Sequence, residues 1–238
     1  MKNNIIHITI LRLAFVVAIL SSGKSLDATY YINDDLVVDG DTVLEGTLEV
    51  FDAATLQQTL EVQGSAIIGT GGSAGGSGAV AFGSWTGASG WGALAGGGDT
   101  FASGNMSVAI GDVSSASASG AAAFGTGTSA SGSGSLASRF LTTASGNLST
   151  AFGTGTLAPS YASISVGRYN IGDVSSGGSS QWNEEDPLFE IGNGTSSSNR
   201  SNALTVFKDG DMHVHDGAVR IQPQGDIGMG TFDNGTQP

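Results

Sequence analysis

The sequence of 238 residues lacks cysteine, which excludes disulfide staples and cysteine-ligated metal centres. It has only four prolines and no strict Gly-X-Y period, which excludes a collagen triple helix. No Lys or Arg occurs from Leu26 through Ser138, so this region lacks the clustered basic side chains that bind nucleic-acid phosphates. The formal net charge of −13 is typical of an acidic, solvated surface.

Long hydrophobic runs are also missing. The uninterrupted apolar run near the N-terminus, Leu13 to Leu20, has eight residues, whereas a membrane-spanning helix needs roughly 20. Lys2 and Arg12 precede this run, and small or polar residues follow it. We therefore predict that residues 1–28 are a signal peptide cleaved near Ala28, although a core strand is the alternative. The protein is then expected to be secreted or held at the cell surface, associated with the outer membrane if its source is Gram-negative.

Glycine is abundant instead, with 39 residues, in a chain that is also 39% hydrophobic. Disordered chains have few apolar residues to bury, so simple disorder does not explain this composition. A tightly wound repeat does.

A 14-residue repeat is visible in the sequence, without insertion or deletion. Position 1 of each coil is defined by these residues: Ser65, Ala79, Ala93, Ser107, Ala121, Ser135, Ser149 and Ser163. Position 5 is Gly in every copy except the one with Arg139, and position 10 is Ala from Ala74 to Ala158. Fourteen residues suit two short strands joined by turns, with the position 5 Gly expected at a corner. The sequence therefore predicts an all-β fold, a parallel β-roll or solenoid, over residues 65–170.

Alternation within each copy separates the side chains into two faces. Small residues at position 3 are predicted inside the roll: Ala81, Ala95, Ala109, Ala123, Ala137 and Ala151. Apolar residues at positions 2 and 4 are predicted outside: Val80, Phe82, Val108, Ile110, Phe124, Phe152, Ile164 and Val166. Such an apolar stripe is expected to pack against other copies of the chain around one axis. The alternative is a wider monomeric coil with this stripe in its core and the Ala column outward.

The repeat resembles the head of YadA-like trimeric autotransporter adhesins. The resemblance rests on SVAIG at Ser107, a small polar loop and Ala-Ser-Gly, repeated over about Ser65 to Tyr169. It implies a left-handed parallel β-roll, a homotrimer with the Val, Ile and Phe columns on the trimer axis, and attachment to surfaces, matrix proteins, cells or glycans. The chain departs from that family in lacking sustained heptads of a coiled-coil stalk, and Ser138 and Arg139 are expected to disturb one coil.

The flanks read as further short strands. Residues 29–64 are predicted to form an N-terminal β cap, residues 171–182 a Gly/Ser linker, and residues 183–238 a C-terminal β-strand region. The C-terminal strands are expected in LFEIGNG, RSNALTVFKDG and AVRIQPQG. This block resembles segments of bacterial surface and phage tail-fibre proteins that often precede an intramolecular chaperone domain.

No constellation of catalytic residues is evident, so we predict a protein that is not an enzyme and uses no cofactor. His213 and His215 would share a face in a strand and could bind a metal, but no third ligand is evident. The DGD turns at Asp39 and Asp209 do not fit an EF-hand. Two alternative functions stay open: a tail-fibre-like segment that binds carbohydrate, and an ice-binding solenoid. The second was suggested by a column at position 8: Thr86, Thr100, Ser114, Thr128, Thr142 and Thr156.

Overall fold

The computed structural model describes residues 64–173, 178–215, 217–222 and 227–229, together with six short strands between residues 19 and 50. These residues form strands, turns and loops without any helix, so none of them belongs to a helix that could cross a membrane. The chain divides into two compact units, Met1–Glu61 and Val62–Pro238. The predicted all-β solenoid of stacked 14-residue coils is confirmed in the larger unit.

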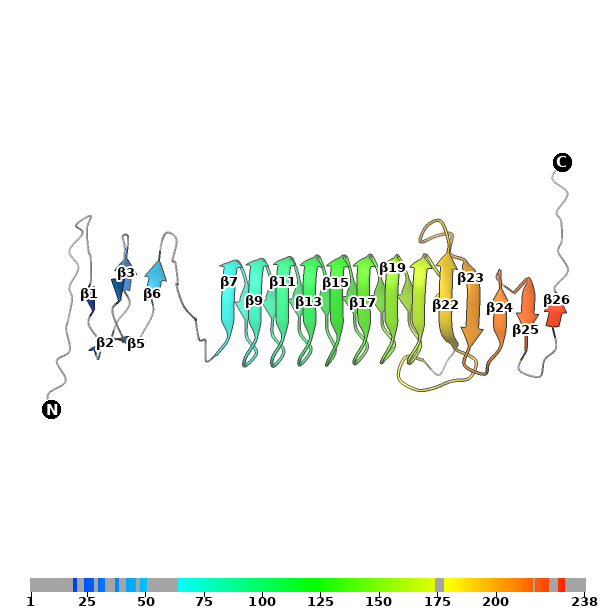
Figure 1. The fold of residues 1–238 in the computed structure, drawn as a ribbon, viewed down its shortest axis with the longest axis horizontal. Helices are drawn as coiled ribbons and strands as arrows, with labels where there is room; N and C mark the ends of the chain where they lie inside the picture. Colours follow the sequence, from blue (N-terminus) through cyan, green and yellow to red (C-terminus); the bar gives the residue numbers. More distant parts are fainter. Residues whose placement is uncertain are drawn as a thin grey trace. The chain divides into compact units, whose positions relative to one another are not determined.

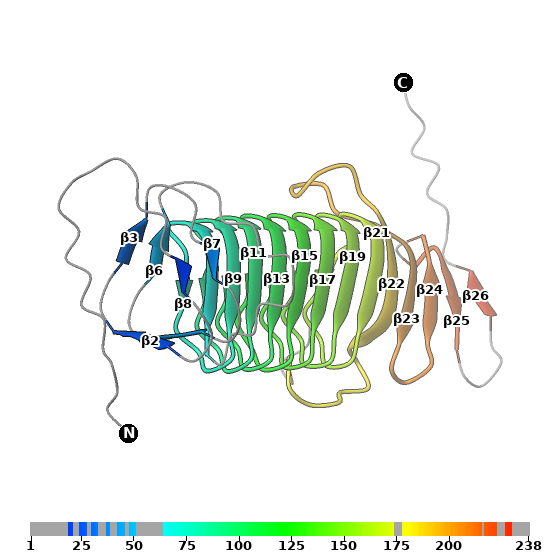
Figure 2. The ribbon, with the colours of Figure 1, turned by 60° about the vertical axis from the view of Figure 1, so that its left-hand side comes forward.

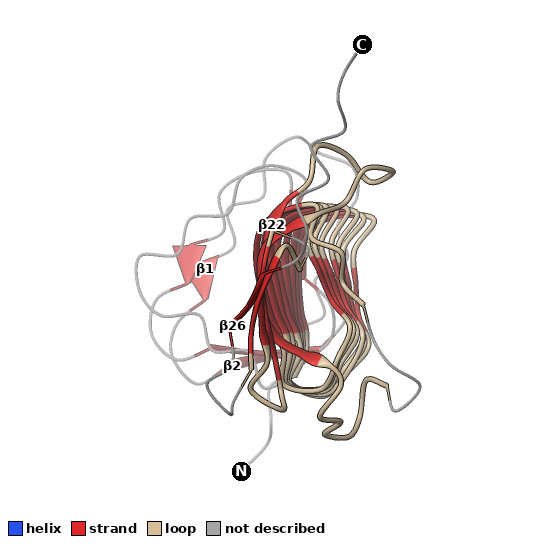
Figure 3. Ribbon diagram, turned by 90° about the vertical axis from the view of Figure 1, so that its right-hand side faces the viewer, coloured by secondary structure: helices blue, strands red, loops and turns tan. Residues whose placement is uncertain are grey.

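Each coil of the larger unit contributes one long strand and one short strand. The long strands are β7 (Ala66–Thr70), β9 (Val80–Ser84), β11 (Leu94–Gly98), β13 (Val108–Asp112), β15 (Ala122–Thr126), β17 (Leu136–Phe140), β19 (Thr150–Thr154) and β21 (Ile164–Arg168). The short strands are β8 (Ser73–Ala74), β10 (Gly87–Ala88), β12 (Phe101–Ala102), β14 (Ser115–Ala116), β16 (Ser129–Ala130), β18 (Thr143–Ala144) and β20 (Leu157–Ala158). The two kinds of strand form two separate sheets, which lie as two layers when the coils are viewed end-on (Figure 3).

The strands of successive coils pair in parallel and in perfect repeat register. Val80 pairs with Leu94 and Leu94 with Val108, a step of one 14-residue repeat each time. Identical positions therefore stack in columns along the unit, as the parallel arrows of Figures 1 and 2 show. The hydrophobic core lies between the two layers and consists of alanines from both.

Glycine at position 5 lies within the long strand, so the expectation of a corner was wrong, whereas the positive φ or close backbone approach expected of this glycine is confirmed. Its φ runs from 93° to 138° in the coils, and a Cβ there would collide with the position 5 backbone of the next coil. The corners are at positions 7 and 14, which adopt left-handed φ whether occupied by Gly71 and Gly78 or by residues such as Trp85 and Met106.

Arg139 occupies position 5 in one coil with φ of 94°, a conformation that L residues rarely adopt. Strand β17 nevertheless keeps its full register with β15 and β19. The disturbance expected in this coil is thus confined to local backbone strain, while the Arg139 guanidinium lies 5.5 Å from the centre of the Phe152 ring.

Five further strands extend the long-strand sheet beyond the coils, to a total of 13. They are β22 (Pro187–Asn193), β23 (Asn202–Phe207), β24 (Met212–Val214), β25 (Val219–Ile221) and β26 (Ile227–Met229). Strand β22 pairs with β21 in parallel, and the strands that follow pair in antiparallel order. The short-strand sheet ends at β20, so among the described strands this extension has no second layer. Part of the predicted linker, residues 174–177, lies outside the described residues.

The smaller unit is itself coiled. Strands β1 (Ile19–Leu20), β2 (Lys24–Asp27) and β3 (Tyr30–Ile32) pair in parallel with β4 (Val37–Val38), β5 (Thr42–Glu45) and β6 (Leu48–Val50). Each pairing joins residues 18 apart, as in 24 with 42. Strands β1 and β2 fall within the predicted signal peptide, whereas its first 18 residues and the cleavage position near Ala28 lie outside the described residues.

Candidate functional site

The inward face of the coils is filled by very small side chains. The six interior candidates are all fully buried members of the core: Ala81, Ala95, Ala109, Ala123, Ala137 and Ala151. The position 10 alanines face them from the short strands, for example Ala88 and Ala116. Within the coils, apart from Asn170 at their C-terminal end, the largest fully buried side chains are threonines. The space between the two layers therefore has no room for a ligand.

The outward face of the long strands carries the apolar candidates. Val80, Val108, Ile110 and Val166 are half-buried. Phe82, Phe124, Phe152 and Ile164 are exposed, with 36% to 44% of their surface open to solvent. The register places these residues in two adjacent columns that run along the sheet. Gly96 and Ser138 are the small residues in the position 4 column, and the Phe82 ring extends over Gly96.

These columns do not end with the repeat, a feature that the sequence reasoning missed. Phe189 and Ile191 of β22 pair with Ile164 and Val166. The same two rows then continue across β23, β24 and β25 as Val206 and Leu204, Met212 and Val214, and Ile221 and Val219. The signal in the sequence was the segment Phe-Glu-Ile-Gly at 189–192, which repeats the Val-Ala-Ile-Gly pattern of position 2 to position 5. The outer face is thus apolar on strands inside and outside the repeat.

A polar cluster closes the interior at its C-terminal end. Glu190 pairs with Ser165 in the register and so takes the place of an interior alanine. Its carboxylate accepts hydrogen bonds of 2.6 Å from both Asn170 Nδ2 and Asn202 Nδ2, and longer ones from Ser165 Oγ and the Gly172 amide. Because all four partners are donors, the charged carboxylate is well matched to this site.

Burial raises the pKa of Glu190 above its usual value, while the hydrogen bonds from Asn202, Asn170, Gly172 and Ser165 oppose that shift. The carboxylate has no lysine or arginine among its hydrogen-bond partners. The arrangement provides hydrogen-bond acceptors for Ser165, Asn170 and the Gly172 amide at the end of the last coil. It is a structural cap, because the side chain is enclosed and offers no access to a substrate.

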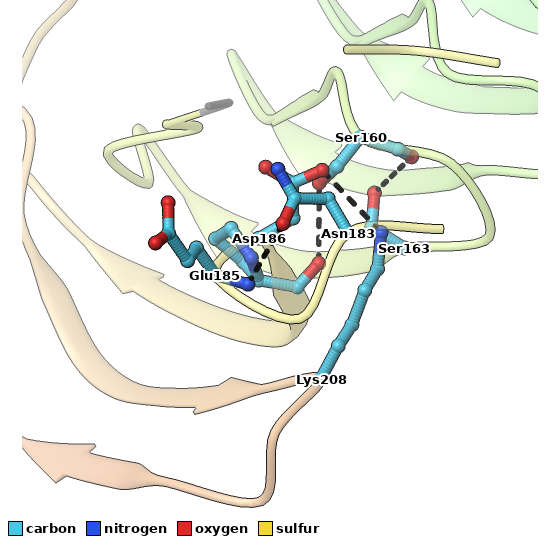
Figure 4. A network of polar contacts seen from close by, with 7 residues as sticks. Ser160, Ser163, Asn183, Glu185, Asp186 and Lys208 are labelled. Atoms are coloured by element: carbon cyan, nitrogen blue, oxygen red, sulfur yellow. Dashed lines mark hydrogen bonds and ion pairs between the residues drawn. The ribbon is translucent and has the colours of Figure 1, made fainter. Parts of the chain in front are cut away.

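A second buried polar contact holds the loop before β22 to the end of β23 (Figure 4). Lys208 Nζ lies 3.6 Å from Asp186 Oδ2, and both side chains are fully buried. The Trp182 ring lies 5.2 Å from the same ammonium group. Burial lowers the pKa of Lys208, and the Asp186 carboxylate opposes that shift. Ser160 Oγ donates to the Pro187 carbonyl beside this pair, which ties the loop to the last coil.

The residues considered for metal binding do not converge. Strand β24 ends at Val214, and His215 follows it with φ of 52°, so the two histidines do not share a strand face. His213 packs edge-on against Phe207. Asp209 Oδ1 accepts a hydrogen bond from the Asp211 amide, as an acidic turn does. Among the described residues, no group of three or more His, Asp or Glu side chains could hold a metal ion. Asp39 to Asp41 lie outside the described residues.

The position 8 column, which suggested an ice-binding surface, points inward. Its hydroxyl residues are 0% to 2% exposed, and Thr128 Oγ1 donates to Ser114 Oγ of the preceding coil. This column is therefore part of the interior and cannot contact ice.

No protein-family model matches the chain, and no curated protein matches it at a significant level.

Proposed function

We propose that this chain is the head of an exported, adhesin-like homotrimer that assembles through the outer face of its 13-stranded sheet. In this proposal the remaining surface attaches the assembly to a surface, matrix protein, cell or glycan. The observation that carries it is the pair of apolar columns that runs from the coils into β22, β23, β24 and β25. An apolar face of this length marks an interaction surface.

The chain itself offers no second function for this face. The core is complete without it, because the alanine columns of the two layers fill the interior. Burial of exposed aromatic surface against a second copy would favour assembly by on the order of 1 kcal/mol for each of Phe82, Phe124 and Phe152. Identical patches bury one another most economically in a closed symmetric assembly. The number three comes from the resemblance of the repeat to trimeric adhesin heads.

The proposed activity is adhesion through a repeated surface, without catalysis or cofactor. A narrow interior filled by Ala, Ser and Thr supports this role, since it gives a long, rigid scaffold with no internal site. The proposed location is outside the cell, in keeping with the predicted signal peptide.

Mass measurement tests the proposal directly. The full-length protein is expected to elute with three times the mass of one chain in light scattering. Ile110→Asp, on the outer face of β13, is expected to give a folded monomer, because a buried unpaired carboxylate opposes assembly while the same residue in a monomer contacts water. Ser117→Asp provides the matched control, since Ser117 is exposed on the opposite layer. A monomeric parent, or a trimer that tolerates Ile110→Asp, would contradict the proposal.

A further inference from the structure

Three exposed aromatic residues lie away from the apolar columns, on two adjacent coils. Trp85, Trp91 and Phe101 are 67%, 58% and 53% exposed. They occupy positions 7, 13 and 9, which border or lie on the short-strand layer. The coil does not require an aromatic residue at any of these positions. Its neighbours have Ser115 and Ser129 at position 9, Ser119 and Ser133 at position 13, and Gly127 at position 7.

Two of these rings lie next to a glycine of the preceding coil. A Cβ added to Gly71 would meet the Trp85 indole at 3.0 Å, and one added to Gly87 would meet Phe101 Cδ1 at 2.9 Å. Gly87 pairs directly with Phe101 in the parallel sheet. Each ring therefore contacts a glycine of the preceding coil while more than half of the residue stays exposed, so it can serve as an aromatic platform.

The two platforms are close neighbours. Residues 85 and 87 are two apart in one coil, which is at most roughly 7 Å, and adjacent coils are about 4.8 Å apart. Trp85 and Phe101 therefore present two rings within reach of consecutive units of an extended ligand. Trp91 lies at the far corner of the same coil, where its amide nitrogen donates to Asn105 Oδ1 of the next coil.

The surface between the rings is polar but almost uncharged. Ser89 and Ser103 expose hydroxyl groups at position 11, and Asn105 is exposed beside Trp91. The nearest ionisable side chain in the sequence is the acidic Asp99, and the chain has no Lys or Arg between Leu26 and Ser138. An anionic ligand would meet no countercharge here.

We infer that Trp85, Phe101 and Trp91 form a binding strip for a neutral polysaccharide. A sugar ring has an apolar C–H face, which matches an aromatic platform, and a rim of hydroxyls, which matches serine and amide groups. The strip lies on an open outer surface, whereas sites for small molecules are concave, so a polymer is the fitting ligand. A protein partner fits less well, because serine and glycine separate the rings and no contiguous apolar centre forms.

This inference deepens the proposed adhesive function and rests on it, because assembly through the long-strand face leaves the short-strand layer accessible. It predicts that the full-length protein binds at least one of cellulose, chitin and soluble mannan in pull-down or affinity electrophoresis, and binds neither hyaluronan nor heparin. Trp85→Ala and Phe101→Ala are each expected to weaken that binding by about tenfold or more, as loss of a central aromatic contact does.

Gly87→Ala gives a sharper test, because it keeps all three aromatic residues in the sequence while its Cβ would displace the Phe101 ring. It is expected to weaken binding as Phe101→Ala does, with little change in melting temperature. Leu148→Ala is the matched control, since this residue is exposed at a corner outside the strip. It is expected to bind like the parent.

Failure of the parent to bind any of the three neutral polysaccharides would overturn the inference. So would variants Trp85→Ala and Phe101→Ala that bind as tightly as the parent, or a parent that binds hyaluronan and heparin as tightly as the neutral polysaccharides. Light scattering on the same samples separates the two proposals. A trimer that does not bind would overturn the polysaccharide site alone, whereas a monomer that binds would overturn the assembly and leave the site standing.

Discussion

The coils and the C-terminal extension share one sheet, but among the described strands only the coils have a second layer over its inward face. The inward row reads Ala151 and Ser165 in the coils, then Glu190, Thr205 and His213 in the extension. Burial declines along it, from complete at Ala151 to partial at His213. The inward face thus turns from alanine to polar residues at the place where its cover ends.

The outward face behaves differently. It is apolar in the coils, at Ile110 and Phe152, and remains apolar in the extension, at Leu204 and Met212. If apolar residues merely followed the core of the coils, they would end with it. Their persistence across both regions is the observation that supports the proposed assembly through this face.

The largest effect is expected when a side chain of the inward row is made larger, once in the coils and once in the extension. Ala109→Leu places a larger, branched side chain between two closely packed layers. We expect the free energy of unfolding to fall by at least about 3 kcal/mol, or the variant to fail to fold. His213→Trp adds bulk to the same row where no second layer of described strands lies above it, and we expect the free energy of unfolding to change by no more than about 1 kcal/mol. Urea unfolding of both variants measures the contrast. Equal losses would mean that the extension is packed as tightly as the coils.

A moderate effect is expected from pH at the junction of the two regions. Because burial raises the pKa of Glu190 above 4.5, the folded chain retains this proton to higher pH than the unfolded chain does. The contribution of the Glu190 carboxyl to the stability of the fold is therefore fully present below pH 4.5, and it is lost as the pH rises through the folded-state pKa. The slope is at most about 1.4 kcal/mol per pH unit.

Unfolding free energies at pH 5 and pH 7 isolate this group when the parent is compared with Glu190→Gln. The pKa of His213 is lowered by burial, so its own contribution is lost as pH falls, but it is common to both proteins. The advantage of the parent over Glu190→Gln is expected to shrink from pH 5 to pH 7. A difference that stays constant would show that Glu190 does not titrate in this range.

The smallest effect concerns the glycine column, which runs through the coils and into the first strand of the extension at Gly192. Arg139→Gly is expected to stabilise the protein by about 0.5 to 1 kcal/mol. Relief of a left-handed backbone contributes about 1–2 kcal/mol, and loss of the contact with Phe152 removes about 0.5–1 kcal/mol. Thermal melting checks the sign of the change, and Gly111→Ala, whose Cβ would collide with the Gly125 backbone of the next coil, is expected to melt lower.

By itself the sequence determined the solenoid, its 14-residue coil and its division into a small-residue column and an apolar column. Each of these follows from local periodicity, because stacking in register turns a repeated position into a column. The left-handed conformation at positions 7 and 14 could not be read in the same way, since bulky residues such as Trp85 and Val113 share those positions with glycine.

The tertiary structure alone decided the rest, since the features involved join residues that are far apart in the sequence. Only pairing of β22 with β21 shows that Glu190 caps the interior and that the apolar columns continue. Only packing places the position 8 threonines inside, because the face of a residue beside a turn depends on where the chain bends and not on alternation. The platforms of Trp85 and Phe101 likewise exist only because each ring meets a glycine of the preceding coil.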